Sequence, residues 1–208
     1  MGGKPDLSLE LDDLAADPIG QFRRWYEDAE AEGIHLVNAI ALATADDRGA
    51  PAVRHVLLRG FDDRGFVFFT NYESRKGRHL GENPFAAFAL LWKELDRQVC
   101  VTGRVQRTTD AESDAYFASR PREARIGAWA SRQSTVLAGR EELMSRFGEL
   151  DAEHPGDDVP RPPFWGGYRL EPDTVEFWQA RAFRLHDRFR YTRDAAEPSG
   201  WLLERLSP

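Results

Sequence analysis

The chain has 208 residues, enough for one domain with a sizeable core, and 41% of them are hydrophobic. Its 35 acidic and 28 basic residues give a formal net charge of −7, which argues against a nucleic-acid partner. A single cysteine and a longest apolar run of residues 85–92, too short to span a membrane, lead us to expect a cytoplasmic protein without disulfides.

The first half of the chain predicts one helix followed by a series of strands. Residues 1–16 are acidic and weakly patterned, so we expect a loosely held arm there and one domain over residues 17–208. A helix should begin at Asp17-Pro18, an acidic N-cap followed by proline at the first helical position. A second, short helix should be capped by Ser74 and end near Pro84. Alternating apolar residues between turn signals predict strands over residues 37–45, 52–59, 66–71, 85–92 and 97–106.

The second half predicts a helical insert and then a return to strands. The helices are expected over residues 110–119, 126–132 and 138–150, and the strands over residues 167–170, 174–179, 184–191 and 201–205. Strands on both sides of a helical insert, joined by short hairpins, indicate an antiparallel barrel with packed helices.

Two cationic motifs suggest sites for anions. In a strand, Arg184, His186 and Arg188 would project from one face, either toward a bound anion or as the charged face of an edge strand. Arg75 and Lys76 fall in the first turn of the Ser74-capped helix, where cations oppose the helix dipole. A bound phosphate would remove that conflict, although two exposed cations would also be tolerated.

A third motif is the arginine-rich segment 120–134, which follows Tyr116 and could hold a planar phosphorylated ligand or form a basic helical surface. The five histidines have no metal-ligand spacing, so we expect no metal. No P-loop, dinucleotide fingerprint or serine nucleophile elbow occurs. Several phosphate-compatible sites without a nucleotide-binding loop point to another kind of phosphorylated cofactor.

Taken in order, these segments resemble the pyridoxine/pyridoxamine 5′-phosphate oxidase family. The matching stretches are residues 54–60, 65–77, 83–84, 97–99, 116–134, 165–169 and 176–191. The resemblance implies a mainly β, antiparallel FMN-binding split barrel with packed helices, assembled as a homodimer with FMN at the subunit interface. It also implies oxidation of pyridoxine 5′-phosphate or pyridoxamine 5′-phosphate to pyridoxal 5′-phosphate, with O2 reduced to H2O2.

The resemblance assigns two groups of site residues by position. FMN contacts fall on Arg54, Phe69, Thr70, Arg75, Lys76, Gln98, Gln133, Ser134, Trp178 and Arg188. Substrate contacts fall on Arg59, Tyr116, Arg120, Arg184 and His186. Of these, Arg184 and His186 are the expected catalytic residues, Arg184 orienting the pyridine and His186 hydrogen-bonding the substrate.

Two positions depart from the family pattern near the expected substrate phosphate. Arg59 stands where the family usually has lysine, and Ala124 where it has serine. Two other functions therefore stay open: a related flavin oxidase of the phenazine-biosynthesis type, and a flavin-binding or pyridoxal-phosphate-binding protein without turnover.

Overall fold

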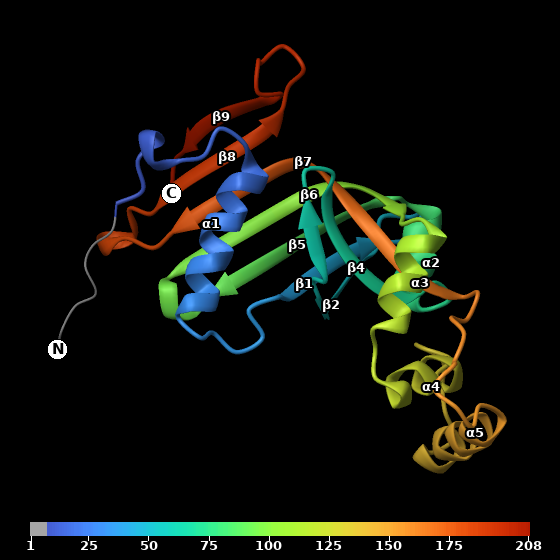
Figure 1. Cartoon of the computed structure of the whole chain (residues 1–208). Helices are drawn as coiled ribbons and strands as arrows, with labels where there is room; N and C mark the ends of the chain where they lie inside the picture. The colour runs from blue at the N-terminus through green and yellow to red at the C-terminus, as the bar shows by residue number, and fades with distance from the viewer. Residues whose placement is uncertain (1–7) are drawn as a thin grey trace.

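A computed structural model describes residues 8–208, which form one curled antiparallel sheet with helices packed around it (Figure 1). The sheet runs in the order β2-β1-β5-β6-β7-β4-β3, with β8 paired to β7 and β9 to β8. Its strands are β1 (Ala39–Ala45), β2 (Pro51–Leu57), β3 (Gly60–Asp62), β4 (Gly65–Asn71), β5 (Phe85–Trp92), β6 (Arg97–Arg107), β7 (Trp165–Gln179), β8 (Asp187–Arg193) and β9 (Trp201–Leu206).

The helices occupy two regions. α1 crosses one face of the sheet, whereas α3, α4 and α5 gather near the end of the sheet where β7 begins (Figure 1). The α-helices are α1 (Pro18–Ala31), α2 (Arg75–Glu82), α3 (Asp110–Ala118), α4 (Arg122–Ala130) and α5 (Arg140–Glu153), and the short 3-10 turns are η1 (Leu11–Asp13), η2 (Lys93–Leu95) and η3 (Ala182–Arg184). No helix among residues 8–208 has both the length and the apolar character needed to cross a membrane.

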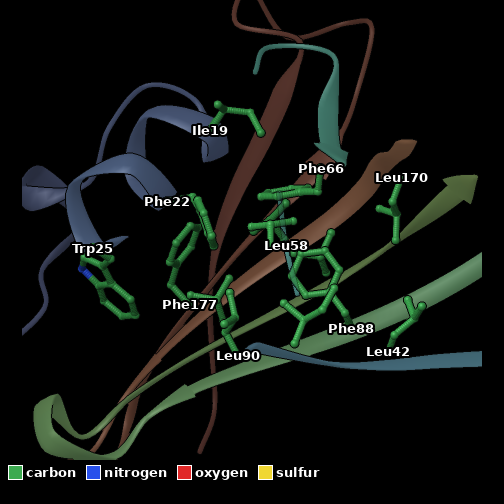
Figure 2. Close-up of a cluster of buried hydrophobic side chains, with 14 of the residues drawn as sticks. Ile19, Phe22, Trp25, Leu42, Leu58, Phe66, Phe88, Leu90, Leu170 and Phe177 are labelled. Carbon is green, nitrogen blue, oxygen red and sulfur yellow. The ribbon is translucent and has the colours of Figure 1, made fainter. Parts of the chain in front are cut away.

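The core lies between α1 and the sheet. The Asp17 carboxylate accepts the Gly20 backbone N–H at 2.8 Å, so the helix begins as predicted. Phe22 is fully buried, with its ring 5.0 Å from that of Phe66, and Trp25 makes an edge contact with Phe177 at 5.2 Å. Figure 2 shows these α1 side chains pointing at the sheet. α1 therefore covers one face of the sheet.

β7 is one 15-residue strand where the sequence predicts two separate strands. Opposite Thr102 and Gly103 of β6 stand Thr174 and Pro172, so Asp173 is an extra residue at a bulge. A side chain at Gly103 would lie 2.0 Å from the Glu171 carbonyl oxygen, so only glycine permits this approach. The bulge lets β7 continue past the proline that the sequence pattern treats as a break.

The segment before α1 is attached to the sheet. The Leu9 N–H donates to the Asp187 carboxylate at 3.1 Å, and the Tyr191 hydroxyl donates to the Ala15 carbonyl at 2.6 Å. Residues 8–16 thus differ from the loosely held arm expected over residues 1–16, because β8 offers polar groups that the local sequence does not reveal. Residues 1–7 lie outside the described part of the chain.

The start of β8 also differs from the prediction. The strand begins at Asp187 rather than at residue 184, and Phe183 and Arg184 have left-handed backbone angles, with φ of 57° and 63°. Both residues belong to the 3-10 turn η3, which precedes the strand. The expectation that Arg184, His186 and Arg188 share one strand face is therefore wrong, because only Arg188 lies in the strand.

Candidate active site

A cavity of about 330 Å³ opens between β2, β4, α2, α3 and the first residue of β7. Four of its side chains carry positive charge, and none of the residues around it is Asp or Glu. The lining residues are Arg54, His55, Val56, Leu57, Arg59, Phe69, Thr70, Lys76, Tyr116, Arg120, Gln133 and Trp165. An acid-free, cationic cavity of this size suits a phosphorylated small molecule.

One end of the cavity is built on the first turn of α2. The Ser74 hydroxyl accepts the Gly77 N–H at 3.3 Å, which confirms the predicted cap. Lys76 Nζ donates to Gln133 Oε1 at 2.8 Å and to Thr70 Oγ1 at 3.0 Å. A side chain at Gly77 would lie 2.1 Å from the Tyr72 carbonyl oxygen, so glycine lets the helix begin directly after β4. The turn thereby brings together three residues that the sequence predicts at one site.

The charges at this end lack a negative counterpart. Burial, and then the charge of Arg54, lowers the pKa of Lys76 to about 8. Burial also lowers the pKa of Arg54, and the charge of Arg75 adds to that effect. In residues 8–208 the hydrogen-bond acceptors of Lys76 and Arg54 are hydroxyl, amide and carbonyl oxygens. The arrangement fits an anion that would supply the missing charge.

The other end is aromatic as well as cationic. The rings of Phe69 and Tyr116 stack at 4.0 Å, and Trp165 lies nearly parallel to both. The Arg120 guanidinium lies 4.8 Å from the Trp165 ring centre, and the Arg59 guanidinium 5.7 Å from that of Tyr116. Arg120 Nη1 is buried and has no hydrogen-bond partner among the described residues. Arg120 also lines the cavity, where a bound anion would give this buried donor a partner.

A second cluster of predicted site residues lies at the far end of β7. Gln98, Trp178 and Arg188 stand opposite one another on β6, β7 and β8, and the His186 ring lies 4.6 Å from that of Trp178. Trp165 and Trp178 are 13 residues apart on one strand, or about 40 Å at roughly 3.3 Å per residue. Figure 1 places the two ends of β7 on opposite sides of the molecule.

The predicted site residues therefore divide into two sets. The cavity contains Arg54, Arg59, Phe69, Thr70, Lys76, Tyr116, Arg120 and Gln133. The far cluster contains Gln98, Trp178, Arg184, His186 and Arg188, none of which lines the cavity. Arg75 and Ser134 adjoin Lys76 and Gln133 but are exposed and do not line it, and Ala124 does not line it either.

Contacts in the far cluster involve residues that the sequence reasoning missed. Arg188 pairs with Glu176 at 2.8 Å and donates to the Ser207 carbonyl at 2.9 Å. His186 Nδ1 accepts the Arg181 backbone N–H at 3.1 Å. Glu176 could have been found from strand alternation, since it shares the outward face of β7 with Trp178. No group of three His, Cys, Asp or Glu side chains in residues 8–208 is arranged to hold a metal.

The comparisons with known proteins agree with this geometry. The family model described as pyridoxamine 5′-phosphate oxidase matches residues 26–153. The chain belongs to the pyridoxine/pyridoxamine 5′-phosphate oxidase family. A second model, described as the pyridoxine 5′-phosphate oxidase C-terminal dimerisation region, matches residues 165–208. The matched C-terminal region contains β7, β8 and β9, and it supports a homodimer.

Members of this family are among the most similar curated proteins. The pyridoxine/pyridoxamine 5′-phosphate oxidase of Burkholderia multivorans is 57% identical over 201 residues, covering 97% of this chain and 94% of the relative. The enzyme of the same name from Burkholderia thailandensis is 54% identical with the same coverage. The family is one of oxidases.

Two solved structures define the fold. PhzG from Burkholderia lata, in complex with tetrahydrophenazine-1-carboxylic acid, has a TM-score of 0.91 at 37% identity, with both chains fully covered. A pyridoxamine 5′-phosphate oxidase-related, FMN-binding protein from Nostoc punctiforme has a TM-score of 0.71 at 18% identity, covering 92% of this chain and 98% of its own. The fold is the FMN-binding split barrel, as the sequence predicts.

Proposed function

We propose that this protein is an FMN-dependent oxidase that converts pyridoxine 5′-phosphate or pyridoxamine 5′-phosphate to pyridoxal 5′-phosphate. The observation that carries the proposal is the acid-free cavity, which is cationic at one end and both cationic and aromatic at the other. When bound, FMN supplies the two-electron acceptor for the substrate carbon, and O2 takes up those electrons as H2O2.

One end of the cavity would hold the FMN phosphate. Lys76 and Arg54 would donate to it together with Arg75, and Thr70, Gln133 and Ser134 would supply neutral hydrogen bonds. Phe69, which lines the cavity and stacks on Tyr116, would contact the ring system. The fit rests on cations whose present acceptors are all neutral oxygens.

A second copy of the chain would complete the site. None of Gln98, Trp178 and Arg188 lines the cavity, and Trp178 lies about 40 Å along β7 from Trp165 on the cavity wall, so the two sets do not meet around one site in a single chain. We propose that these residues, with Arg184 and His186, reach the cavity of the other subunit in a homodimer. Family membership and the C-terminal dimerisation region support this arrangement.

The other end of the cavity would hold the substrate phosphate. Arg120 and Arg59 would neutralise it, and the Tyr116 hydroxyl would donate to it. Arg184 would orient the pyridine ring and His186 would hydrogen-bond it. Arg59 keeps the charge of the usual lysine and adds a planar, bidentate donor, whereas Ala124, the other position that departs from the family pattern, does not line the cavity.

A second candidate function is oxidation of a phenazine precursor, because PhzG is similar over its whole length. A carboxylic acid carries one negative charge, whereas a phosphate monoester carries up to two. The end of the cavity assigned to the substrate has two arginines, Arg59 and Arg120, which favours the phosphate.

The test is peroxide release by the purified protein. We expect yellow protein whose released flavin is FMN, and peroxide with pyridoxine 5′-phosphate or pyridoxamine 5′-phosphate. Peroxide only with a reduced phenazine carboxylic acid would favour the second candidate. Bound FMN without peroxide from any of these substrates would favour a non-catalytic flavin-binding protein.

FMN affinity should fall at alkaline pH because of Lys76. Its folded pKa of about 8 lies below the unfolded value of 10.5, so stability of the flavin-free protein rises with pH between those values. A bound phosphate favours the charged lysine. Between pH 7 and 8 Lys76 is already charged, so FMN affinity should be nearly constant. Above pH 8 FMN binding must be accompanied by uptake of a proton on Lys76, and the affinity should be about tenfold weaker at pH 9.

Fluorescence titration of flavin-free protein from pH 7 to 9.5 checks this expectation, with calorimetry in two buffers to count protons. Lys76→Met should bind FMN more weakly and without the alkaline dependence. A wild-type affinity that stays constant to pH 9.5 would contradict the assignment of Lys76 to the phosphate.

A further inference from the structure

We propose that His79 is a positioning residue, which holds Arg54 in its anion-binding orientation through the hydroxyl of Thr44. The inference rests on the proposed role of Arg54 at the FMN phosphate. Neither His79 nor Thr44 lines the cavity, so both would act through Arg54 rather than on the ligand.

The three side chains form a continuous hydrogen-bonded chain across three elements. Arg54 Nη1, on β2, lies 2.8 Å from Thr44 Oγ1 on β1, and Thr44 Oγ1 lies 3.2 Å from His79 Nδ1 on α2. Arg54 Nη1 also donates to the Leu42 carbonyl at 3.1 Å. Thr44 is 3% exposed and His79 is 7% exposed, so water does not compete for these bonds.

The chemistry of arginine sets the direction of these hydrogen bonds. A guanidinium only donates, so Thr44 Oγ1 accepts from Arg54. The Thr44 hydroxyl proton then has His79 Nδ1 as its acceptor, which places the imidazole proton on Nε2. If His79 donated instead, the hydroxyl proton would be left at a buried site with no acceptor among the described contacts. A proton on Nε2 therefore leaves His79 Nδ1 free to accept the Thr44 hydroxyl proton, which pairs the Thr44 hydroxyl with both Arg54 and His79.

Arg54 needs such an anchor because its neighbours repel it. The charges of Lys76 and Arg75 both act on it. Without Thr44, the flexible arginine would lose a fixed acceptor and would move away from these cations. His79 also lies one turn after Lys76 on α2. The hydrogen bond from Thr44 to His79 therefore also fixes the start of α2 against β1. Both cations are thus positioned together.

The test compares FMN with riboflavin, which lacks the phosphate, on the flavin-free full-length protein. Thr44→Val and His79→Leu should each weaken FMN binding about tenfold, the equivalent of one lost hydrogen bond to a charged group, and leave riboflavin binding unchanged. Thr44→Ser and His79→Gln, which keep a hydroxyl and a neutral acceptor, should restore most of the FMN affinity. Thermal unfolding of each variant measures any loss of fold.

Three outcomes would overturn the inference: unchanged FMN affinity in His79→Leu, equal loss of FMN and riboflavin binding, or failure of His79→Gln to restore affinity in a folded protein. Arg54→Ala separates this inference from the proposed function. If Arg54→Ala loses FMN selectively but His79→Leu does not, only the positioning role fails. If Arg54→Ala has no selective effect, the phosphate site itself is assigned wrongly.

Discussion

Two inactive variants should regain activity when their subunits are combined in one dimer. Arg120→Glu reverses the charge at the substrate end of the cavity, and Arg184→Glu reverses it at the far cluster. If each site uses the cavity of one copy and the far cluster of the other, each homodimer carries a defect in both sites. The mixed dimer has one site with both defects and one intact site, so it should show about half of the wild-type activity.

Co-expression with two affinity tags isolates the mixed dimer for assay of peroxide release. The matched control combines Arg120→Glu with Arg59→Glu; both changes lie in the cavity, and every site in that dimer stays defective. We expect the mixed dimer of Arg120→Glu and Arg184→Glu to recover peroxide release, and the control dimer to stay inactive. A mixed dimer with Arg184→Glu that stays inactive would contradict the two-copy site, because one chain would then supply all of the residues.

Replacing Arg120 by alanine should strongly weaken the binding of phosphorylated substrates and leave the binding of unphosphorylated substrates unchanged. Arg120 Nη1 is a buried donor without a partner among the described residues, and it is held 4.8 Å from the Trp165 ring. Hydrogen bonds to charged groups contribute about 1.5–3 kcal/mol, so the Michaelis constant for pyridoxine 5′-phosphate should rise roughly 10- to 150-fold. Turnover should change little, since the phosphate is bound equally before and during reaction.

Unphosphorylated pyridoxine provides the first control, because its kinetics should be the same in wild type and Arg120→Ala. Arg122→Ala provides the second. Arg122 lies two residues further along, pairs with Asp151 and does not line the cavity, so its loss should affect stability rather than the Michaelis constant. Equal losses on pyridoxine and its phosphate would show that Arg120 supports the fold and does not recognise the phosphate.

Much of the fold could be predicted because its signals are local. β5 begins and ends where its apolar run does, and the Ser74 cap sets the start of α2. Two features could not be predicted because they depend on distant partners. β7 continues through Pro172 only because Gly103 of β6 permits the bulge. The start of β8 depends on the left-handed turn before Asp187.

The candidate site shows the same division between local and distant information. The motifs identified the cationic residues, but the sequence order did not reveal that they form two sets at opposite ends of β7. The anchor of Arg54 was missed because Thr44 and His79 are 35 residues apart and each has an unremarkable local context. Trp165 is buried as a core residue would be, yet it also lines the cavity.

The position of β7 in the sheet has a consequence for how the chain folds during synthesis. β7 lies between β6 and β4, so a nascent chain that ends before Trp165 has no strand to join those two. Until then β6 and β4 are open edges with apolar faces, which can pair with other chains. The sheet closes through contacts between residues far apart in sequence, such as Phe66 with Leu170. The ribosome must therefore release most of the chain before the complete sheet can form, and early termination should yield aggregates instead of a smaller folded protein.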